Sequence, residues 1–247
     1  MLTRQGQDMP AQRDTDRGHP RLPSNVYRDL KAASGTHLDA VATAFAEAGE
    51  ALQDGERERA IRLLREAKQR ATRSWAVREA LGIALYLDEQ YKEAASELGA
   101  YRRMSGRQDQ NHLLADCARA SGQIEKAEDL VAQMMAARVS PDRVAEGLLV
   151  VAGARADHGD PDAALAVLHR MDLEPQTVEP YHLRLWYLAA DLEERRGDPD
   201  AAVGYFSAIA TIDPSFLDVA ERLADGEAAS TSTTQAEAGP SSKRVRQ

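Results

Sequence analysis

A short pattern recurs five times along the chain and constrains its fold more than any other feature: a turn residue followed five positions later by an alanine. Successive copies are 34, 33, 37 and 38 residues apart, which is the period of an internal repeat. Repeats of this length bury a core only by stacking on their neighbours. The copies read GERERA at 55–60, EQYKEA at 89–94, GQIEKA at 122–127, GDPDAA at 159–164 and GDPDAA at 197–202.

Each copy lies between two segments with helical apolar spacing, as in Val77, Leu81 and Leu85 before the second copy. Each repeat is therefore predicted to be a helix, a tight turn and a second helix. Four pairs combine an N-cap side chain with a proline at the first helical position, where the missing N–H costs nothing. These pairs are Ser140-Pro141, Asp160-Pro161, Asp198-Pro199 and Asp213-Pro214. The glycine that opens the later copies can supply the positive φ that ends a preceding helix.

Composition and sterics favour the same fold. Aromatic residues make up only 5% of the chain, so alanine, leucine, valine and isoleucine must build the core, which favours helices over sheets. The recurring alanine is explained by close helix crossing, which needs a small residue at the contact. We predict an all-α repeat domain over 25–225, in which a final amphipathic helix covers the last repeat. The flanking segments 1–24 and 226–247 are polar, and we expect disordered tails there.

The repeats resemble tetratricopeptide repeats (TPRs) over about residues 37–225. The resemblance rests on the period, the Gly-x-Ile-x-x-Ala turn at Gly122, the Leu81-Gly82 pair ahead of Ala94, and Pro214 after the fifth copy. It implies a right-handed α-solenoid of about five repeats, whose first helices line a concave groove for a peptide or a partner protein.

The match to the family pattern varies between repeats. At the turns it is closest in repeats two and three, whereas Arg57, Pro161 and Pro199 stand where an aromatic or large apolar residue is usual. The segments REALGIALY at 78–86 and LADCARASG at 114–122 also resemble a narrower TPR family of actinobacteria. That narrower resemblance implies no activity.

Helix periodicity and the geometry of the TPR family together indicate which side chains line the groove. They are Phe45, Gly49 and Leu52; Glu79, Ile83 and Tyr86; His112, Asp116 and Arg119; Leu149, Gly153 and Ala156; and Tyr187, Asp191 and Glu194. TPR domains that grip a C-terminal carboxylate use Lys, Asn and Arg at corresponding points. The residues there are Phe45, Gly49, His112 and Asp116, which disfavours such a clamp. A purely packed or solvated role stays open for each of the predicted groove residues.

Charge is distributed unevenly along the chain. Residues 57–107 hold twelve Arg or Lys against seven Asp or Glu, whereas residues 111–247 hold thirteen against twenty-three. Four cations recur at spacings that place them on one helical face, and we call them the basic face: Arg62, Arg65, Lys68 and Arg73. One interpretation is a solvated outer surface. The other is a docking patch for an acidic partner or a phosphate backbone.

Catalytic and metal-binding patterns are sparse. The only cysteine, Cys117, lies five residues after His112, so the two side chains diverge by more than about 100° around a helix. We therefore interpret Cys117 as a small buried hydrophobe. The other histidines form neither HxxxH nor HExxH, and no glycine-rich phosphate loop is present in the sequence. We predict no catalytic residue, no metal and no cofactor.

The sequence also limits location and partners. The longest apolar run, GLLVVAGA at 147–154, is far shorter than a membrane span, and the first residues lack an apolar signal core. We therefore expect a cytoplasmic protein with no membrane contact. The net charge of −9 weakens any interpretation as a general nucleic-acid binder.

The leading hypothesis is a non-enzymatic scaffold or adaptor that binds a protein or peptide through the groove, the basic face, or both. A nucleic-acid-associated factor that uses the basic segment 57–107 is the alternative, and a small-molecule enzyme is a third. We expect a monomer, because a specific dimer needs an apolar patch that the sequence does not reveal.

Overall fold

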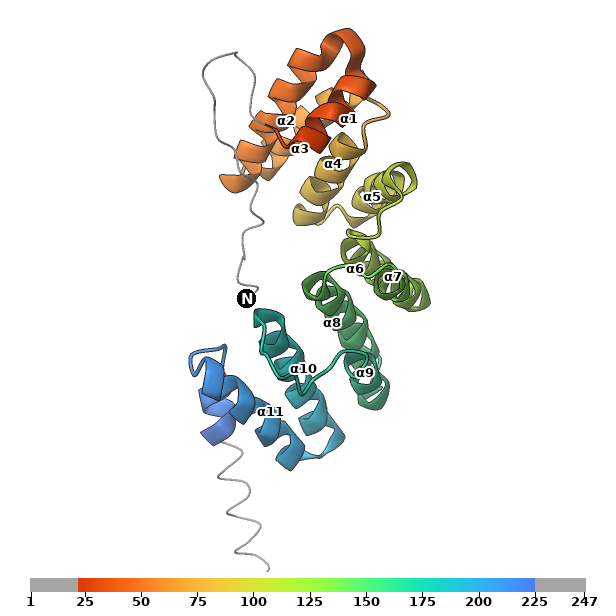
Figure 1. The fold of residues 1–247 in the computed structure, drawn as a ribbon. Helices are drawn as coiled ribbons and strands as arrows, with labels where there is room; N and C mark the ends of the chain where they lie inside the picture. Colours follow the sequence, from red (N-terminus) through yellow and green to blue (C-terminus); the bar gives the residue numbers. More distant parts are fainter. Residues whose placement is uncertain (1–21, 225–247) are drawn as a thin grey trace, which may run out of the picture. The chain divides into compact units, whose positions relative to one another are not determined.

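The protein is described here by a computed structural model, in which residues 22–224 are placed. Residues 1–21 and 225–247, where the tails were expected, lie outside the described residues. Within the described part, the structure is all-α and contains no strand (Figure 1). Its elements are α1 (Ser24–Ser34), the 3-10 helix η1 (Gly35–His37), α2 (Leu38–Gln53), α3 (Arg57–Arg70), α4 (Trp75–Leu87), α5 (Tyr91–Ser105), α6 (Asn111–Ala120), α7 (Ile124–Ala136), α8 (Pro141–Asp157), α9 (Pro161–Leu168), α10 (Pro180–Arg196) and α11 (Pro199–Ile212).

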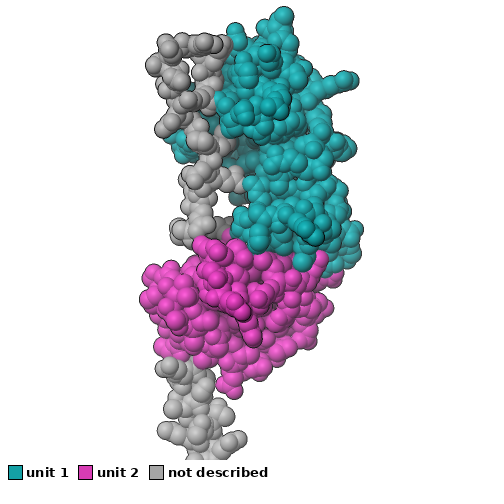
Figure 2. All heavy atoms as spheres, in the orientation of Figure 1, with its two compact units in different colours: residues 1–147 teal, residues 148–247 magenta. Residues whose placement is uncertain are grey.

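The helices from α2 onward form five consecutive pairs, and each pair has its turn where the sequence pattern predicts one. The pairs are α2–α3, α4–α5, α6–α7, α8–α9 and α10–α11. The predicted all-α solenoid class of about five helix-turn-helix repeats is confirmed. The chain divides into two compact units, residues 1–147 and 148–247, with the boundary inside α8 (Figure 2). Each unit is described separately below.

The helix ends follow the predicted local chemistry. The Asp160 carboxylate accepts a hydrogen bond from the Ala163 amide at 2.9 Å, and Asp198 accepts one from Ala201 at 3.1 Å. These bonds satisfy amides that the first helical turn leaves without a partner. Gly159 and Gly197 adopt φ values of 81° and 88°, in the left-handed region that glycine enters without a Cβ penalty.

One predicted helix start differs from the structure. Asp213 accepts hydrogen bonds from the amide and the hydroxyl of Ser215, at 3.0 and 2.7 Å. Residues 214–218 therefore form turns, and helix resumes only at 219–224. The side chain of Asp213 stabilises a turn in place of the first turn of a helix, which is a common use of aspartate.

The recurring alanines are fully or almost fully buried, as predicted. Ala94, Ala127 and Ala164 have no exposed surface and Ala202 is 1% exposed. Gly82 shows how closely the paired helices approach, because a Cβ at this position would lie 2.6 Å from Cγ of Leu98. The contact between α4 and α5 therefore has no room for even one additional methyl group.

The first unit contains a helix that the repeat pattern did not predict. Helix α1 contacts both α2 and α4, and its Leu30 belongs to the hydrophobic core. The Asp29 carboxylate accepts hydrogen bonds from the Ser74 hydroxyl and, at 3.1 Å, from the Ala76 amide. Helix α1 thus supplies an N-terminal cap to α4, 45 residues further along the chain.

The second unit is fixed in part by its longest loop. Between α9 and α10 the chain runs through residues 169–179, and Trp186 Nε1 donates a hydrogen bond to the Leu173 carbonyl at 2.8 Å. Leu173 itself is buried. None of the helices in the described part of the chain is both long and apolar enough to cross a membrane.

The buried alanine at each turn gives a direct test of the repeat packing. We expect Ala127→Leu to lower the free energy of unfolding by about 1 to 3 kcal/mol, because the larger side chain overpacks a closed contact. The exposed Ala132 on the same helix provides the matched control, Ala132→Leu, which adds the same atoms in solvent. Urea titration of both variants measures the difference, and equal midpoints would contradict the packing assignment.

Candidate functional site

The predicted groove residues occupy equivalent places in the first helices of the five pairs. They lie fifteen, eleven and eight residues before the recurring alanine of their repeat. These steps of four and three keep them on one side of a helix. We call these three positions on each first helix its first-helix face. Their burial and their bonding partners differ from one helix to the next.

On α2 the first-helix face is part of the core. Phe45 is only 6% exposed and belongs to the same hydrophobic cluster as Leu30 of α1. Gly49 and Leu52 keep partial exposure. Phe45 is therefore part of the core of the first unit and is not open to a partner. The apolar spacing of Val26, Leu30 and Ala33 is the sequence signal from which α1 was predictable.

On α4 and α6 the predicted residues come together across two repeats. Tyr86 donates its hydroxyl hydrogen to Asp116 Oδ2 at 2.7 Å, and Arg119 Nε donates to Asp116 Oδ1 at 2.6 Å. Burial and the neighbouring carboxylate both raise the pKa of Tyr86. Tyr91 of α5 packs edge-on against the Tyr86 ring, with ring centroids 5.8 Å apart. Tyr86, Asp116 and Arg119 remain partly exposed.

A second hydrogen bond joins the turn before α6 to α4, nearer the start of α4. Gln110 Nε2 donates a hydrogen bond to Glu79 Oε1 at 2.7 Å, across 31 residues of sequence. Burial raises the pKa of Glu79, and the bond from Gln110 acts in the opposite direction. Gln110 is buried and was missed at the sequence level, since glutamine in a turn carries no pattern that indicates burial.

His112 differs from its neighbours on the first-helix face. It is 8% exposed, and its Nδ1 lies 3.1 Å from the Asp109 carbonyl oxygen. Burial lowers the pKa of His112 to about 4. The Asp109 side chain accepts hydrogen bonds from Tyr101, at 2.6 Å, and from Arg107. His112 is therefore a neutral packed residue beside a polar cluster.

In the second unit, the segment after α11 bonds to the first-helix face of α10, whose Glu194 stays exposed. Tyr187 donates to Asp218 Oδ1 at 2.6 Å, and burial together with this bond raises the pKa of Tyr187 to about 12. Arg222 donates to Glu194 Oε2 at 2.5 Å and to Asp191 Oδ1 at 3.3 Å. These three α10 side chains hold the chain's own C-terminal segment. On α8, the predicted positions remain partly exposed: Leu149, Gly153 and Ala156.

Two of the four cations of the basic face form ion pairs. Arg65 pairs with Glu93 at 2.7 Å, and Lys68 pairs with Glu97 at 2.6 Å, so these two cations of α3 meet carboxylates of α5. Arg62 is exposed. Arg73 lies in the turn after α3, because that helix ends at Arg70, and it does not continue the helical stripe.

Cys117 is buried, as expected, with 2% of its surface exposed. Burial raises the pKa of its thiol to about 12, so the thiolate that nucleophilic chemistry requires is scarce at neutral pH. Within residues 22–224, no three His, Cys, Asp or Glu side chains are grouped in a way that could hold a metal ion.

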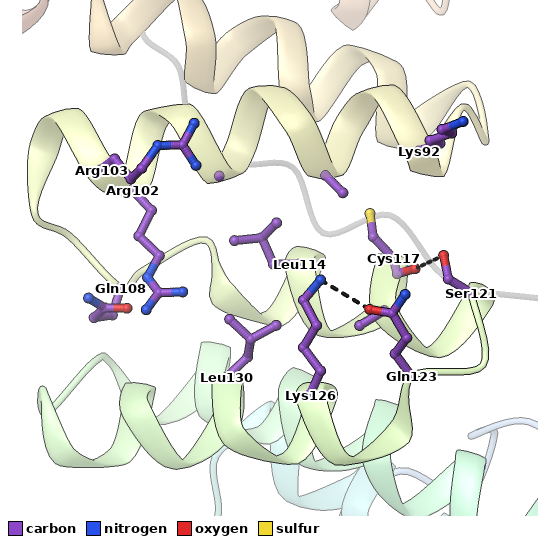
Figure 3. Close-up of a pocket in the computed structure, with 13 residues that line it drawn as sticks. Lys92, Arg102, Arg103, Gln108, Leu114, Cys117, Ser121, Gln123, Lys126 and Leu130 are labelled. Atoms are coloured by element: carbon purple, nitrogen blue, oxygen red, sulfur yellow. Dashed lines mark hydrogen bonds between the residues drawn. The ribbon is translucent and has the colours of Figure 1, made fainter.

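A pocket of about 710 Å³ lies between α5, α6 and α7 (Figure 3). Cationic side chains surround it: Lys92, Arg102, Arg103 and Lys126. Apolar atoms line its middle, with Leu114 and Leu130 between the charged ends. This pocket was not predicted from the sequence, because its lining residues come from three helices and the turns beside them and share no period.

The buried His112 predicts a pH dependence with a definite sign. The imidazole has a folded-state pKa of about 4, below the value near 6.5 expected in the unfolded chain. As the pH falls from 6.5 to 4, the unfolded chain binds a proton that the folded one does not, which lowers stability by about 2 to 3 kcal/mol. We expect His112→Gln to remove this part of the pH dependence in denaturant titrations. An NMR titration of His112 with a midpoint near 6.5 would contradict the assignment.

The contact between Arg222 and α10 can be tested by reversing the charge of Arg222. We expect Arg222→Glu to lower the free energy of unfolding by about 1 to 2 kcal/mol, because it replaces two ion pairs with repulsion from Asp191 and Glu194. Limited proteolysis should then cleave earlier after α11. The exposed neighbour Glu221 gives the control variant Glu221→Lys. If both variants resist protease like the unmodified chain, the C-terminal segment is not held by Arg222.

Comparison with known proteins identifies the repeat type. The tetratricopeptide repeat model matches residues 183–226, which include most of α10, all of α11 and the segment after it. The match falls on the fifth repeat, although its turn carries Pro199 where an aromatic or large apolar residue is usual in the family. No curated protein matches the chain.

Solved structures show the same fold. YrrB, described as a TPR protein with an unusual peptide-binding site, is 18% identical, with a TM-score of 0.53 over 78% of this chain and 96% of its own. TTC0263, a thermophilic TPR protein of Thermus thermophilus, is 17% identical, with a TM-score of 0.52 over 75% of this chain and 98% of its own. The chain therefore contains a tetratricopeptide repeat at residues 183–226, and its fold is that of tetratricopeptide-repeat proteins.

Proposed function

We propose that the protein is a non-enzymatic scaffold that binds a peptide or protein partner on the first-helix face of α4 and α6. One observation carries the proposal: hydrogen bonds join α4 both to α6 and to the turn that precedes α6, across two successive repeats. Tyr86 reaches Asp116 at one end, and Gln110 reaches Glu79 at the other. Ile83 lies between Glu79 and Tyr86 on α4 and is partly exposed.

This surface is preorganised for binding. Asp116 and Arg119 are held by their mutual bond at 2.6 Å, so a partner does not have to immobilise them. Ordering a flexible side chain at an interface costs about 0.5 to 1.5 kcal/mol, and a bonded network avoids part of that cost. The network offers carboxylate, guanidinium and phenol groups around an apolar centre at Ile83. This mixture suits a peptide that carries both polar and aliphatic side chains.

We place the binding surface on α4 and α6 because the corresponding residues of α2 and α10 are buried or bonded within the chain. On α2 the corresponding Phe45 is packed in the core with α1. On α10 the corresponding Tyr187 is bonded to Asp218 of the C-terminal segment. In the first unit, α4 is the first helix that keeps all three predicted positions partly exposed, and on α6 Asp116 and Arg119 do so. The TPR fold of YrrB, described as having a peptide-binding site, supports peptide binding by analogy of fold alone.

The alternative functions receive less support. Arg65 and Lys68 of the basic face are already paired with carboxylates, which weakens their attraction for a phosphate backbone. For an enzyme, the neutral His112 and the protonated thiol of Cys117 offer no activated nucleophile. The narrower resemblance to an actinobacterial TPR family stays a proposal that rests on the segments at 78–86 and 114–122.

Site-specific photo-crosslinking in cells tests the proposed function. We expect a benzoylphenylalanine at Ile83 to give a discrete crosslinked protein under ultraviolet light, because a bound partner would cover this position. The same amino acid at the exposed Thr211 of α11 is the control for nonspecific capture. Adding Tyr86→Ala to the Ile83 probe should reduce the crosslink. Equal yields at Ile83 and Thr211 would overturn the assignment of this face.

A further inference from the structure

We propose that the pocket between α5, α6 and α7 binds an acidic segment of a partner protein, with an aliphatic side chain seated between two carboxylate-bearing ends. The proposal rests on the proposed function, in that the chain binds proteins. It assigns a second surface, built mainly from the second helices α5 and α7 and from the side of α6 that faces them. We call it the cationic pocket, and its lining residues all belong to the first unit.

The charges of the cationic pocket are not compensated within the described chain. Lys92, Arg102, Arg103 and Lys126 line it, and no Asp or Glu of the described residues does. None of the four forms an ion pair with a carboxylate in residues 22–224. Arg102 and Lys126 donate instead to the neutral amide oxygens of Gln133 and Gln123, the latter at 3.1 Å.

Three other cations of the first unit are paired with carboxylates. Arg65 and Lys68 each lie within 2.7 Å of a carboxylate oxygen of α5. Arg119 is likewise bonded to a carboxylate, that of Asp116. Several cations of the first unit are therefore paired with carboxylates, whereas the four cations of the cationic pocket have no carboxylate partner among the described residues. Unpaired like charges gathered at a pocket attract an anionic ligand.

The dimensions of the cationic pocket select the kind of anion. Lys92 lies in the first turn of α5 and Arg103 in the last, and Figure 3 shows them at opposite ends of the pocket. Eleven residues of helix separate their Cα atoms by about 16 Å. A single phosphate or carboxylate ion is too small to reach both ends. About five extended residues, or three helical turns, span that distance.

The apolar residues in the middle of the pocket favour a peptide over a nucleic acid as its ligand. Leu114, Leu130 and Ala118 supply apolar surface between the charged ends. No aromatic ring lines the pocket within the described residues, so bases have no platform on which to stack. An aliphatic side chain gains free energy by covering this floor, whereas a continuous phosphate backbone would place charge against it. Acidic residues that flank an aliphatic one complement the whole lining.

The glycine in α5 permits a variant that fills the pocket without disturbing the fold. Gly99 lines the pocket, and a Cβ there would meet only Nη1 of Arg103, at 3.5 Å. Gly99→Leu therefore fills space that a ligand would occupy, and leucine is a better helix former than glycine. Gly204 on α11 is the matched control, since a Cβ there would meet nothing within 4 Å.

Peptide selection on the full-length protein tests the proposal. The probe is a phage-displayed library of random 16-residue peptides, followed by fluorescence anisotropy of the enriched peptides after synthesis. We expect the enriched peptides to carry Asp or Glu on both sides of Leu, Ile or Val. Their Kd should rise by at least about tenfold for the double variant Arg103→Glu/Lys126→Glu and for Gly99→Leu. The control variants Arg28→Glu/Lys31→Glu and Gly204→Leu should bind like the unmodified chain.

Other outcomes overturn the proposal. The pocket would lose its assignment as an acidic-peptide site if the enriched peptides lacked acidic residues. The same follows if they bound the pocket variants as tightly as the unmodified chain. In either case the crosslink at Ile83 decides the proposed function separately. A single-stranded 12-nucleotide RNA whose binding is lost in Arg103→Glu/Lys126→Glu, with no acidic peptide enriched, would assign the pocket to nucleic acid instead. If no peptide is enriched and Ile83 gives no crosslink, both the pocket and the proposed function fail.

Discussion

The close contact between the two helices of each repeat is the constraint on which the rest of the structure depends. The alanine that follows each turn is buried, and Gly82 leaves no room for a Cβ against Leu98. Because these contacts accept only small residues, they fix how far each second helix lies from its first helix. This packing sets where the polar side chains of α4 and α6 lie. It also sets the width of the cationic pocket, which Gly99 lines.

Polar side chains then join one repeat to the next. Glu97 of α5 is buried and receives ion pairs from Lys68 of α3, at 2.6 Å, and from Arg78 of α4, at 2.7 Å. Two cations around one buried carboxylate compensate much of the cost of removing it from water. Between α4 and α6, Tyr86 and Asp116 make a bond of 2.7 Å. Bonds of this kind hold equivalent faces of successive repeats side by side.

The two proposed surfaces share α6 but use different residues of it, and they differ in charge. The first-helix face of α4 and α6 contains a carboxylate, Asp116, already matched by Arg119. The cationic pocket is lined by Lys92, Arg103 and two further cations without carboxylate partners. A matched network favours recognition through shape and hydrogen bonds, whereas unmatched cations favour an acidic ligand. Repeat proteins offer two such surfaces because each repeat exposes both of its helices.

The sequence by itself determined the repeat period, the helix pairs, the caps at Asp160 and Asp198, the buried alanines and the buried Cys117, since each depends on residues close together in the chain. Only the tertiary structure decided which predicted site residues are accessible. Phe45 is packed in the core with α1, Tyr187 is bonded to Asp218, and Lys68 is paired with Glu97. The last two contacts join residues about 30 positions apart, one repeat along the chain, where periodicity indicates proximity but not which side chains pair. The cationic pocket was unpredictable for the same reason, because its lining comes from three helices whose separation is set by packing.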